Sequence, residues 1–94
     1  MIQEEFKESV EYIRSTILPK LQEIQRDLTG MLNGVSINVS FDGQNGSVFS
    51  FVSVTDEYST ITDTCSTNFF FVDSKEELDK KYNELAEFLK KYLA

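Results

Sequence analysis

The chain has 94 residues, of which 40% are hydrophobic, and a formal net charge of −7. This length fits one domain with a small core, and the composition is typical of a folded globule. Histidine is absent, which excludes Ser-His and Cys-His catalysis and removes the commonest general base and metal ligand. The single cysteine, Cys65, excludes an internal disulfide and fits a reducing compartment.

No targeting or membrane-spanning segment is evident in the sequence. The first thirty residues lack an apolar signal-peptide core, and no run of eighteen apolar residues occurs. We therefore expect a cytoplasmic protein that does not enter membranes. The stretch 42–46 lacks the alternate acids and terminal Glu of a calcium loop, and no Lys follows Gly46 as in a phosphate loop. We expect no cofactor and no dedicated metal site.

Residues 2–33 follow a helical pattern. Their apolar residues recur every three or four positions, at Phe6, Val10, Ile13, Ile17, Leu21, Ile24, Leu28 and Leu32. Pro19 cannot donate a hydrogen bond to the Ser15 carbonyl, so the helix should kink or break there. The apolar residues keep the same helical spacing before and after Pro19, which favours a kink over two separate helices. Two alternatives stay open: the helix bends to wrap a sheet, or one end overhangs and pairs with a second copy. Gly30 and Asn33-Gly34 are candidate helix ends.

A β-hairpin is predicted over residues 35–54. Val35, Ile37, Val39 and Phe41 alternate with polar residues, which indicates a strand with one wet face. Asp42-Gly43 and Asn45-Gly46 supply turn residues. The run after Val48 is apolar on both sides, as in a strand inside a sheet. We expect a core that joins Phe41, Phe49 or Phe51, Ile17 and Leu85.

The residue pattern after position 58 predicts one or two further strands and a final helix. Residues 59–67 alternate Thr with other residues, whereas residues 69–72 are apolar and core-like, so one bent strand and two short ones are both possible. Ser74 and Glu77 form a capping box before a helix that runs to about Leu93. The prediction is one α+β domain, residues 1–94, in the order α-β-β-β-α with a three- to four-stranded antiparallel sheet. The two helices cover one sheet face and leave the Ser/Thr face exposed.

Acidic residues without basic neighbours mark the centre of the chain. Residues 35–72 contain four acids and no Lys or Arg. Such a segment repels nucleic acid and attracts a basic protein surface. Cys65 has no base or cation within this segment to activate it, so we interpret it as a strand residue. The candidate protein-binding residues are Asp42, Asp56, Glu57, Tyr58 and Asp63.

Three hypotheses for function follow. The first is a non-enzymatic binding protein that contacts a basic protein surface. Small acidic α+β chains recur among inhibitors, immunity proteins, secretion chaperones and phage-encoded antagonists, although no motif carries that likeness. The second is a structural or assembly protein that forms a homodimer through the long first helix. The third is a carboxylate-based enzyme or small-ligand carrier, which requires a deep pocket lined by acids such as Asp56 and Asp63. Under the first, reversing Asp56 and Glu57 to Lys slows association without disturbing the fold.

Overall fold

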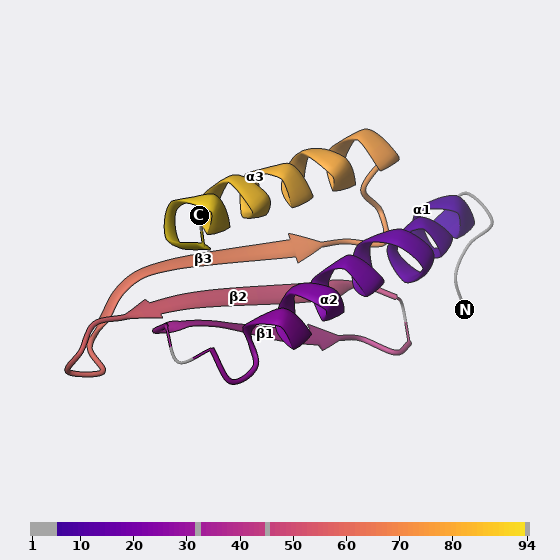
Figure 1. The fold of residues 1–94 in the computed structure, drawn as a ribbon. Coiled ribbons are helices and arrows are strands. Elements are labelled where there is room, and N and C mark those ends of the chain that lie inside the picture. Colours follow the sequence, from indigo (N-terminus) through magenta and orange to yellow (C-terminus); the bar gives the residue numbers. More distant parts are fainter. Residues whose placement is uncertain (1–5, 32, 45, 94) are drawn as a thin grey trace.

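The computed structural model describes residues 6–31, 33–44 and 46–93, and it has the predicted α-β-β-β-α order (Figure 1). The N-terminal helical segment consists of α1 (Lys7–Tyr12), η2 (Ile13–Ile17) and α2 (Leu18–Leu28). The strands β1 (Val35–Phe41), β2 (Val48–Thr55) and β3 (Ile61–Phe69) follow, and α3 (Lys75–Leu93) ends the fold. No helix in the described part of the chain has the length and hydrophobicity needed to cross a bilayer.

The sheet is an antiparallel meander in the order β1-β2-β3. Val35 lies opposite Val54 at one end of the first hairpin, and Phe41 lies opposite Val48 at the other. The strand that is apolar on both sides, β2, is central as predicted. The third strand is continuous from Ile61 to Phe69 and ends there, with no second short strand after it in the described chain. Phe69 is buried, but Phe70 and Val72 are 45% and 54% exposed, so the prediction that residues 69–72 belong to the core was wrong for these two. Antiparallel hairpins place the β1–β2 turn and the β2–β3 turn at opposite ends of the sheet.

A π-helical turn, rather than a simple gap in the helix, accommodates Pro19. Residues Ile13–Ile17 form this wide turn, and the Leu18 N–H bonds back to the Ile13 carbonyl. Pro19 then occupies the first turn of α2, where its missing N–H costs least. The irregularity expected near Pro19 is thus present as a π turn. The helix ends at Leu28, and Gly30 follows with φ +81°, so the earlier of the two candidate ends is used. The positions predicted helical at residues 2–5 and at Leu32 lie outside the described residues.

Both helical segments pack on the same face of the sheet, as predicted (Figure 1). The middle of the apolar stripe of the first segment is buried there, since Ile13, Ile17 and Leu21 are at most 1% exposed, whereas α1 contains no buried residue. The core beneath the helices contains the following side chains: Ile13, Ile17, Leu21, Leu28, Val35, Ile37, Val48, Val52, Val54, Phe69, Leu78, Leu85 and Leu89.

The predicted aromatic core was wrong in part. Ile17 and Leu85 are buried, but Phe41 is 62% exposed and Phe49 is 36% exposed. The register explains Phe49 and Phe51, because the valines of β2 face the helices and the two phenylalanines share the open face. Phe41 shares the helix-side face of β1 but stands at the end of an edge strand. Aliphatic side chains and Phe69 therefore form the core.

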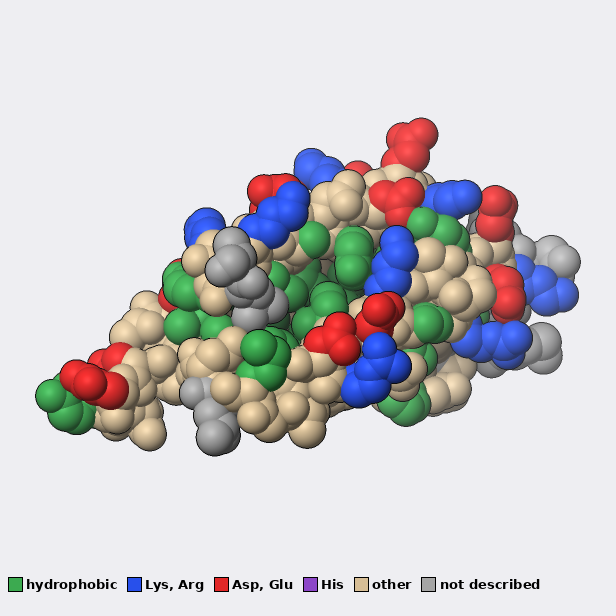
Figure 2. Space-filling model, in the orientation of Figure 1, with side chains coloured by type: hydrophobic (Ala, Val, Ile, Leu, Met, Phe, Trp, Pro, Cys, Tyr) green, Lys and Arg blue, Asp and Glu red, His purple; other side chains and the backbone are tan. Residues whose placement is uncertain are grey.

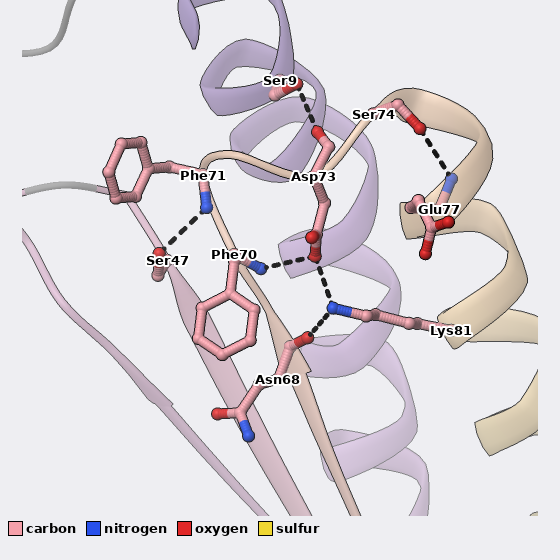
Figure 3. Close-up of polar contacts among 9 residues, drawn as sticks. All are labelled: Ser9, Ser47, Asn68, Phe70, Phe71, Asp73, Ser74, Glu77 and Lys81. Carbon is pink, nitrogen blue, oxygen red and sulfur yellow. Dashed lines mark hydrogen bonds and ion pairs between the residues drawn. The ribbon is translucent and has the colours of Figure 1, made fainter.

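The connection from β3 to α3 is held by a compact polar cluster (Figure 3). Ser74 caps α3 by accepting a hydrogen bond from the Glu77 N–H at 3.1 Å, which confirms that half of the predicted capping box. The Asp73 carboxylate accepts from the Phe70 N–H and from Lys81 Nζ, at 3.0 and 2.5 Å. Ser9 on α1 donates to the Asp73 carbonyl at 2.5 Å. This cluster fixes α1, β3 and α3 relative to one another.

Candidate protein-binding site at the β2–β3 turn

The β2–β3 turn carries three of the five predicted site residues, Asp56, Glu57 and Tyr58. It forms one end of an elongated molecule whose principal extents are 48 × 22 × 19 Å, and it reaches beyond the helices (Figure 1). Figure 2 shows acidic side chains beside a hydrophobic one at this narrow end. We call residues 56–61 the hairpin tip. Its position makes these side chains accessible to a partner without any rearrangement of the helices.

Hydrogen bonds from one carboxylate brace the tip. Asp56 Oδ1 accepts from the backbone N–H groups of Tyr58 and Thr60, at 2.9 and 3.0 Å. The Asp56 N–H donates to the Thr60 carbonyl, and the Ser59 N–H donates to the Asp56 carbonyl, both at 3.0 Å. Ser59 completes the turn with φ +63°, a left-handed conformation that is uncommon for serine. Asp56 is therefore part of the turn itself, and its reversal to Lys would remove these two side-chain bonds together with the charge.

Two apolar side chains stand exposed on this rigid turn. Tyr58 is 80% exposed and Ile61 is 58% exposed. Glu57 is exposed beside Tyr58, and no described Lys or Arg forms an ion pair with Glu57 or Asp56. The tip thus presents an aromatic ring and an aliphatic side chain next to uncompensated negative charge.

Asp63 does not belong to this surface. Its partner in the register is Val54, which points toward the helices, so Asp63 lies on the helix-covered face of β3. Its Oδ2 accepts from the Tyr92 hydroxyl at 2.5 Å and its Oδ1 accepts from the Thr64 N–H at 2.9 Å. The bond to Asp63 raises the pKa of Tyr92 above its ordinary value, with smaller contributions from desolvation and from the Asp63 charge. Asp63 connects the end of α3 to β3.

Asp42 lies at the opposite end of the sheet from the tip. Its Oδ1 accepts from the Gln44 N–H at 2.9 Å, which closes the β1–β2 turn. Its carbonyl accepts from the Gly46 N–H at 2.9 Å. The five predicted residues are therefore split: Asp56, Glu57 and Tyr58 come together, Asp63 sits under α3, and Asp42 is remote.

The tip lies outside the grooves that the structure describes. A groove of about 760 Å³ runs along α3 and is lined in part by Cys65 and Phe88. Asp56, Glu57, Tyr58 and Asp63 contribute nothing to it. Within the described residues, no group of three or more Cys, Asp or Glu side chains is arranged to hold a metal ion. What the tip can do chemically is offer aromatic contact and negative charge to another molecule.

Ile61 is the tip residue that the sequence did not indicate. From the alternation of residues 59–67, the sequence predicted only that Ile61 and the threonines lie on opposite faces of the strand. A register shift between Val54 and Thr55 pairs Ile61 with Thr55 and leaves Ile61 at the exposed end of the hairpin. Bulges of this kind have no signal in residue spacing, so the exposure of Ile61 needs the structure.

Comparison of the chain with models of protein families, with curated proteins and with solved structures found no match in any of the three.

Proposed function

We propose that this chain is a non-enzymatic binding module of inhibitor or antagonist type, and that its hairpin tip contacts a basic surface on another protein. The observation that carries the proposal is the side chain of Tyr58, 80% exposed on a turn that the Asp56 carboxylate braces. Large aromatic side chains on rigid supports often contribute most of the energy of a protein interface. A turn already ordered before binding loses little conformational entropy when it binds.

Charge supports a basic partner rather than a neutral or acidic one. Residues 35–72 contain only acids among their charged residues, and Glu57 stands next to Tyr58 without a described cation. An acidic protrusion steers toward a positive surface during encounter. The protruding shape favours a concave site, since a tip of this kind can enter a groove that a flat surface cannot.

A photo-crosslinking experiment finds the partner and locates the contact. A benzophenone amino acid replaces Tyr58 in one variant and Ser66, on the open sheet face, in another. The proposal predicts a crosslinked basic protein from position 58 and none from position 66. Crosslinks confined to position 66 would place the contact on the open face and contradict the proposal.

Affinity for that partner then tests the role of the ring. Tyr58→Ala should weaken binding by about 2 kcal/mol, or roughly thirtyfold in Kd. Phe70→Ala is the matched control, because Phe70 is 45% exposed and follows β3 at the other end of the sheet. Equal affinities for the wild type and Tyr58→Ala would exclude the tip as the binding element.

A further inference from the structure

The two outer edges of the sheet expose different backbone groups. In an antiparallel ladder, alternate residues direct their N–H and C=O groups toward the neighbouring strand. The Thr55 N–H bonds to the Gly34 carbonyl at 2.8 Å, and the Asp42 N–H bonds to the Ser47 carbonyl at 2.9 Å. In the register of the first hairpin, the even-numbered residues of β1 therefore bond to β2. Ile37, Val39 and Phe41 direct their backbone groups away from the sheet.

Side chains bond two of the outward backbone groups on the free edge of β3. The same alternation directs the backbone of Thr64 and Asn68 outward. The Thr64 N–H donates to Asp63 Oδ1 at 2.9 Å, and Lys81 Nζ donates to the Asn68 carbonyl at 2.7 Å. A register shift next to Ile61 adds an irregularity. Charged side chains and bulges are the usual means by which native sheets prevent edge-to-edge pairing.

The free edge of β1 has almost none of this protection. Its seven residues, Val35–Phe41, contain no charge and no proline, and their pairing with β2 has no register shift. One outward group is capped, because the Val35 N–H donates to Asn33 Oδ1 at 3.1 Å. No hydrogen bond among the described residues reaches the outward groups of Ile37, Val39 or Phe41. Phe41 stands 62% exposed at the end of this edge.

We propose that β1 pairs with β1 of a second copy of this chain, so that one antiparallel sheet runs through a symmetric dimer. Full overlap of the two strands places Val35 opposite Phe41 of the second copy and Asn38 opposite Asn38 on the two-fold axis. This register bonds odd-numbered residues to each other, and these are the residues whose backbone groups point outward. Phe41 gains an apolar neighbour on the helix side. The contact is isologous, so one uncharged strand is sufficient for both sides.

A second copy can occupy this edge because β1 carries none of the acids that make two copies repel. Each chain has a net charge of −7, so two copies repel wherever their acids meet. Strand β1 carries none of that charge. On α2, Lys20 Nζ lies 4.8 Å from the ring centre of Tyr82 on α3. The side of α2 that carries Lys20 therefore faces α3. Helical spacing puts Leu18, Gln22 and Gln25 on the other flank, beside β1, and none of them is acidic.

The groove next to Phe41 is consistent with this assignment. It has a volume of about 300 Å³ and is lined in part by Arg14, Leu18 and Phe41. Its lining contains one cation, Arg14, and one acid, Asp42, so it offers a basic protein no acidic cluster. The dimer uses the apolar part of this edge and leaves the hairpin tip of each chain free, so it does not depend on the proposed function.

Sedimentation over a concentration series tests the dimer with two matched variants. Asn38→Lys puts two lysines opposite each other on the two-fold axis, and like charges directly opposite destabilise strand pairing. Ser66→Lys adds the same charge on the same open face, but on β3. The wild type and Ser66→Lys should approach twice 10.8 kDa, whereas Asn38→Lys should stay at 10.8 kDa. A wild type that remains monomeric up to millimolar concentration would overturn the proposal.

Amide hydrogen exchange by NMR shows whether the dimer uses this edge. In the monomer, the N–H groups of Ser36, Asn38 and Ser40 are protected by β2, and those of Ile37, Val39 and Phe41 are not. Dimerisation should slow exchange at Ile37, Val39 and Phe41 as concentration rises, and Asn38→Lys should abolish that protection. A species of dimer mass in which these three amides still exchange freely would mean that another surface forms the contact.

Discussion

Lys81 on α3 and Asp73 in the β3–α3 connection form the least exposed ion pair of the described chain, with Nζ 2.5 Å from Oδ2 (Figure 3). Their side chains are 24% and 15% exposed. The same ammonium group donates to the Asn68 carbonyl at 2.7 Å, and its nitrogen lies 4.8 Å from the ring centre of Phe70. One side chain thus supports the helix connection and caps the free edge of β3.

Lys81→Ala should destabilise the fold by about 1.5–3 kcal/mol, because it removes the cation beside a half-buried carboxylate and leaves the Asn68 carbonyl without its donor. Lys90→Ala is the control on the same helix. Lys90 pairs with Glu87 at 3.0 Å, but both side chains are more than 70% exposed, so its loss should cost less than about 1 kcal/mol. Urea unfolding of both variants measures the difference. Equal costs would mean that the cluster adds nothing beyond a surface ion pair.

Leu85→Ala should cost about 2–5 kcal/mol, since the side chain is fully buried and its removal leaves a cavity between α3 and the rest of the core. Phe41→Ala, measured in dilute solution, should cost far less because Phe41 is 62% exposed. Thermal unfolding compares the two. If Phe41→Ala proved as costly as Leu85→Ala, Phe41 would belong to the core after all.

The contrast between Leu85 and Phe41 shows what residue patterns can and cannot predict. Helical spacing placed Leu85 correctly, and alternation placed Phe41 correctly on the helix-side face of β1. Alternation assigns a face, but it does not say how far the helices extend over that face. In β2 both faces are apolar, so the pattern alone could not decide whether the valines or Phe49 and Phe51 meet the helices.

The candidate site was predictable only in its local part. Asp56, Glu57 and Tyr58 are consecutive and necessarily share one turn. Asp42 and Asp63 are separated from that turn by strands, and their positions depend on hairpin direction and on which face of β3 meets α3. The hydrogen bonds that Asp56 makes to the turn could not be predicted from the sequence. An acidic residue in a turn looks the same in the sequence whether its carboxylate bonds to the backbone or faces solvent.

Ser50→Ala should stabilise the protein by about 1–2 kcal/mol. Ser50 is fully buried on the helix-side face of β2, and its hydroxyl has no hydrogen-bond partner among the described residues. Removing a buried hydroxyl without a partner removes its desolvation cost. Ser53→Ala on the open face is the control, and it should be neutral or mildly destabilising because Ser53 Oγ lies 2.9 Å from Ser36 Oγ. Destabilisation by Ser50→Ala in chemical unfolding would contradict this reading of the core.

Stability should fall at alkaline pH, in part through Tyr12. The Tyr12 hydroxyl donates to Asp79 Oδ1, and this bond, with desolvation and the Asp79 charge, raises the pKa of Tyr12 above 10.0. A pKa raised in the folded state gives stability that is complete below the unfolded pKa and is lost as pH rises through the folded one. Tyr12→Phe should therefore be less stable than the wild type at neutral pH, and the gap should close above pH 10. A gap independent of pH would show that the bond to Asp79 is not its origin.

The most direct test of the binding proposal is the rate of association with the crosslinked partner at low and at physiological salt. Glu57→Lys reverses a charge at the tip without touching the Asp56 bonds, and Glu84→Lys makes the same reversal on α3. Both change the net charge from −7 to −5. Because salt screens steering by exposed charges, Glu57→Lys should slow association most at low salt and flatten the salt dependence, whereas Glu84→Lys should stay close to the wild type. Equal rates for the wild type and Glu57→Lys at both salt concentrations would contradict the proposal that the hairpin tip recognises a basic surface.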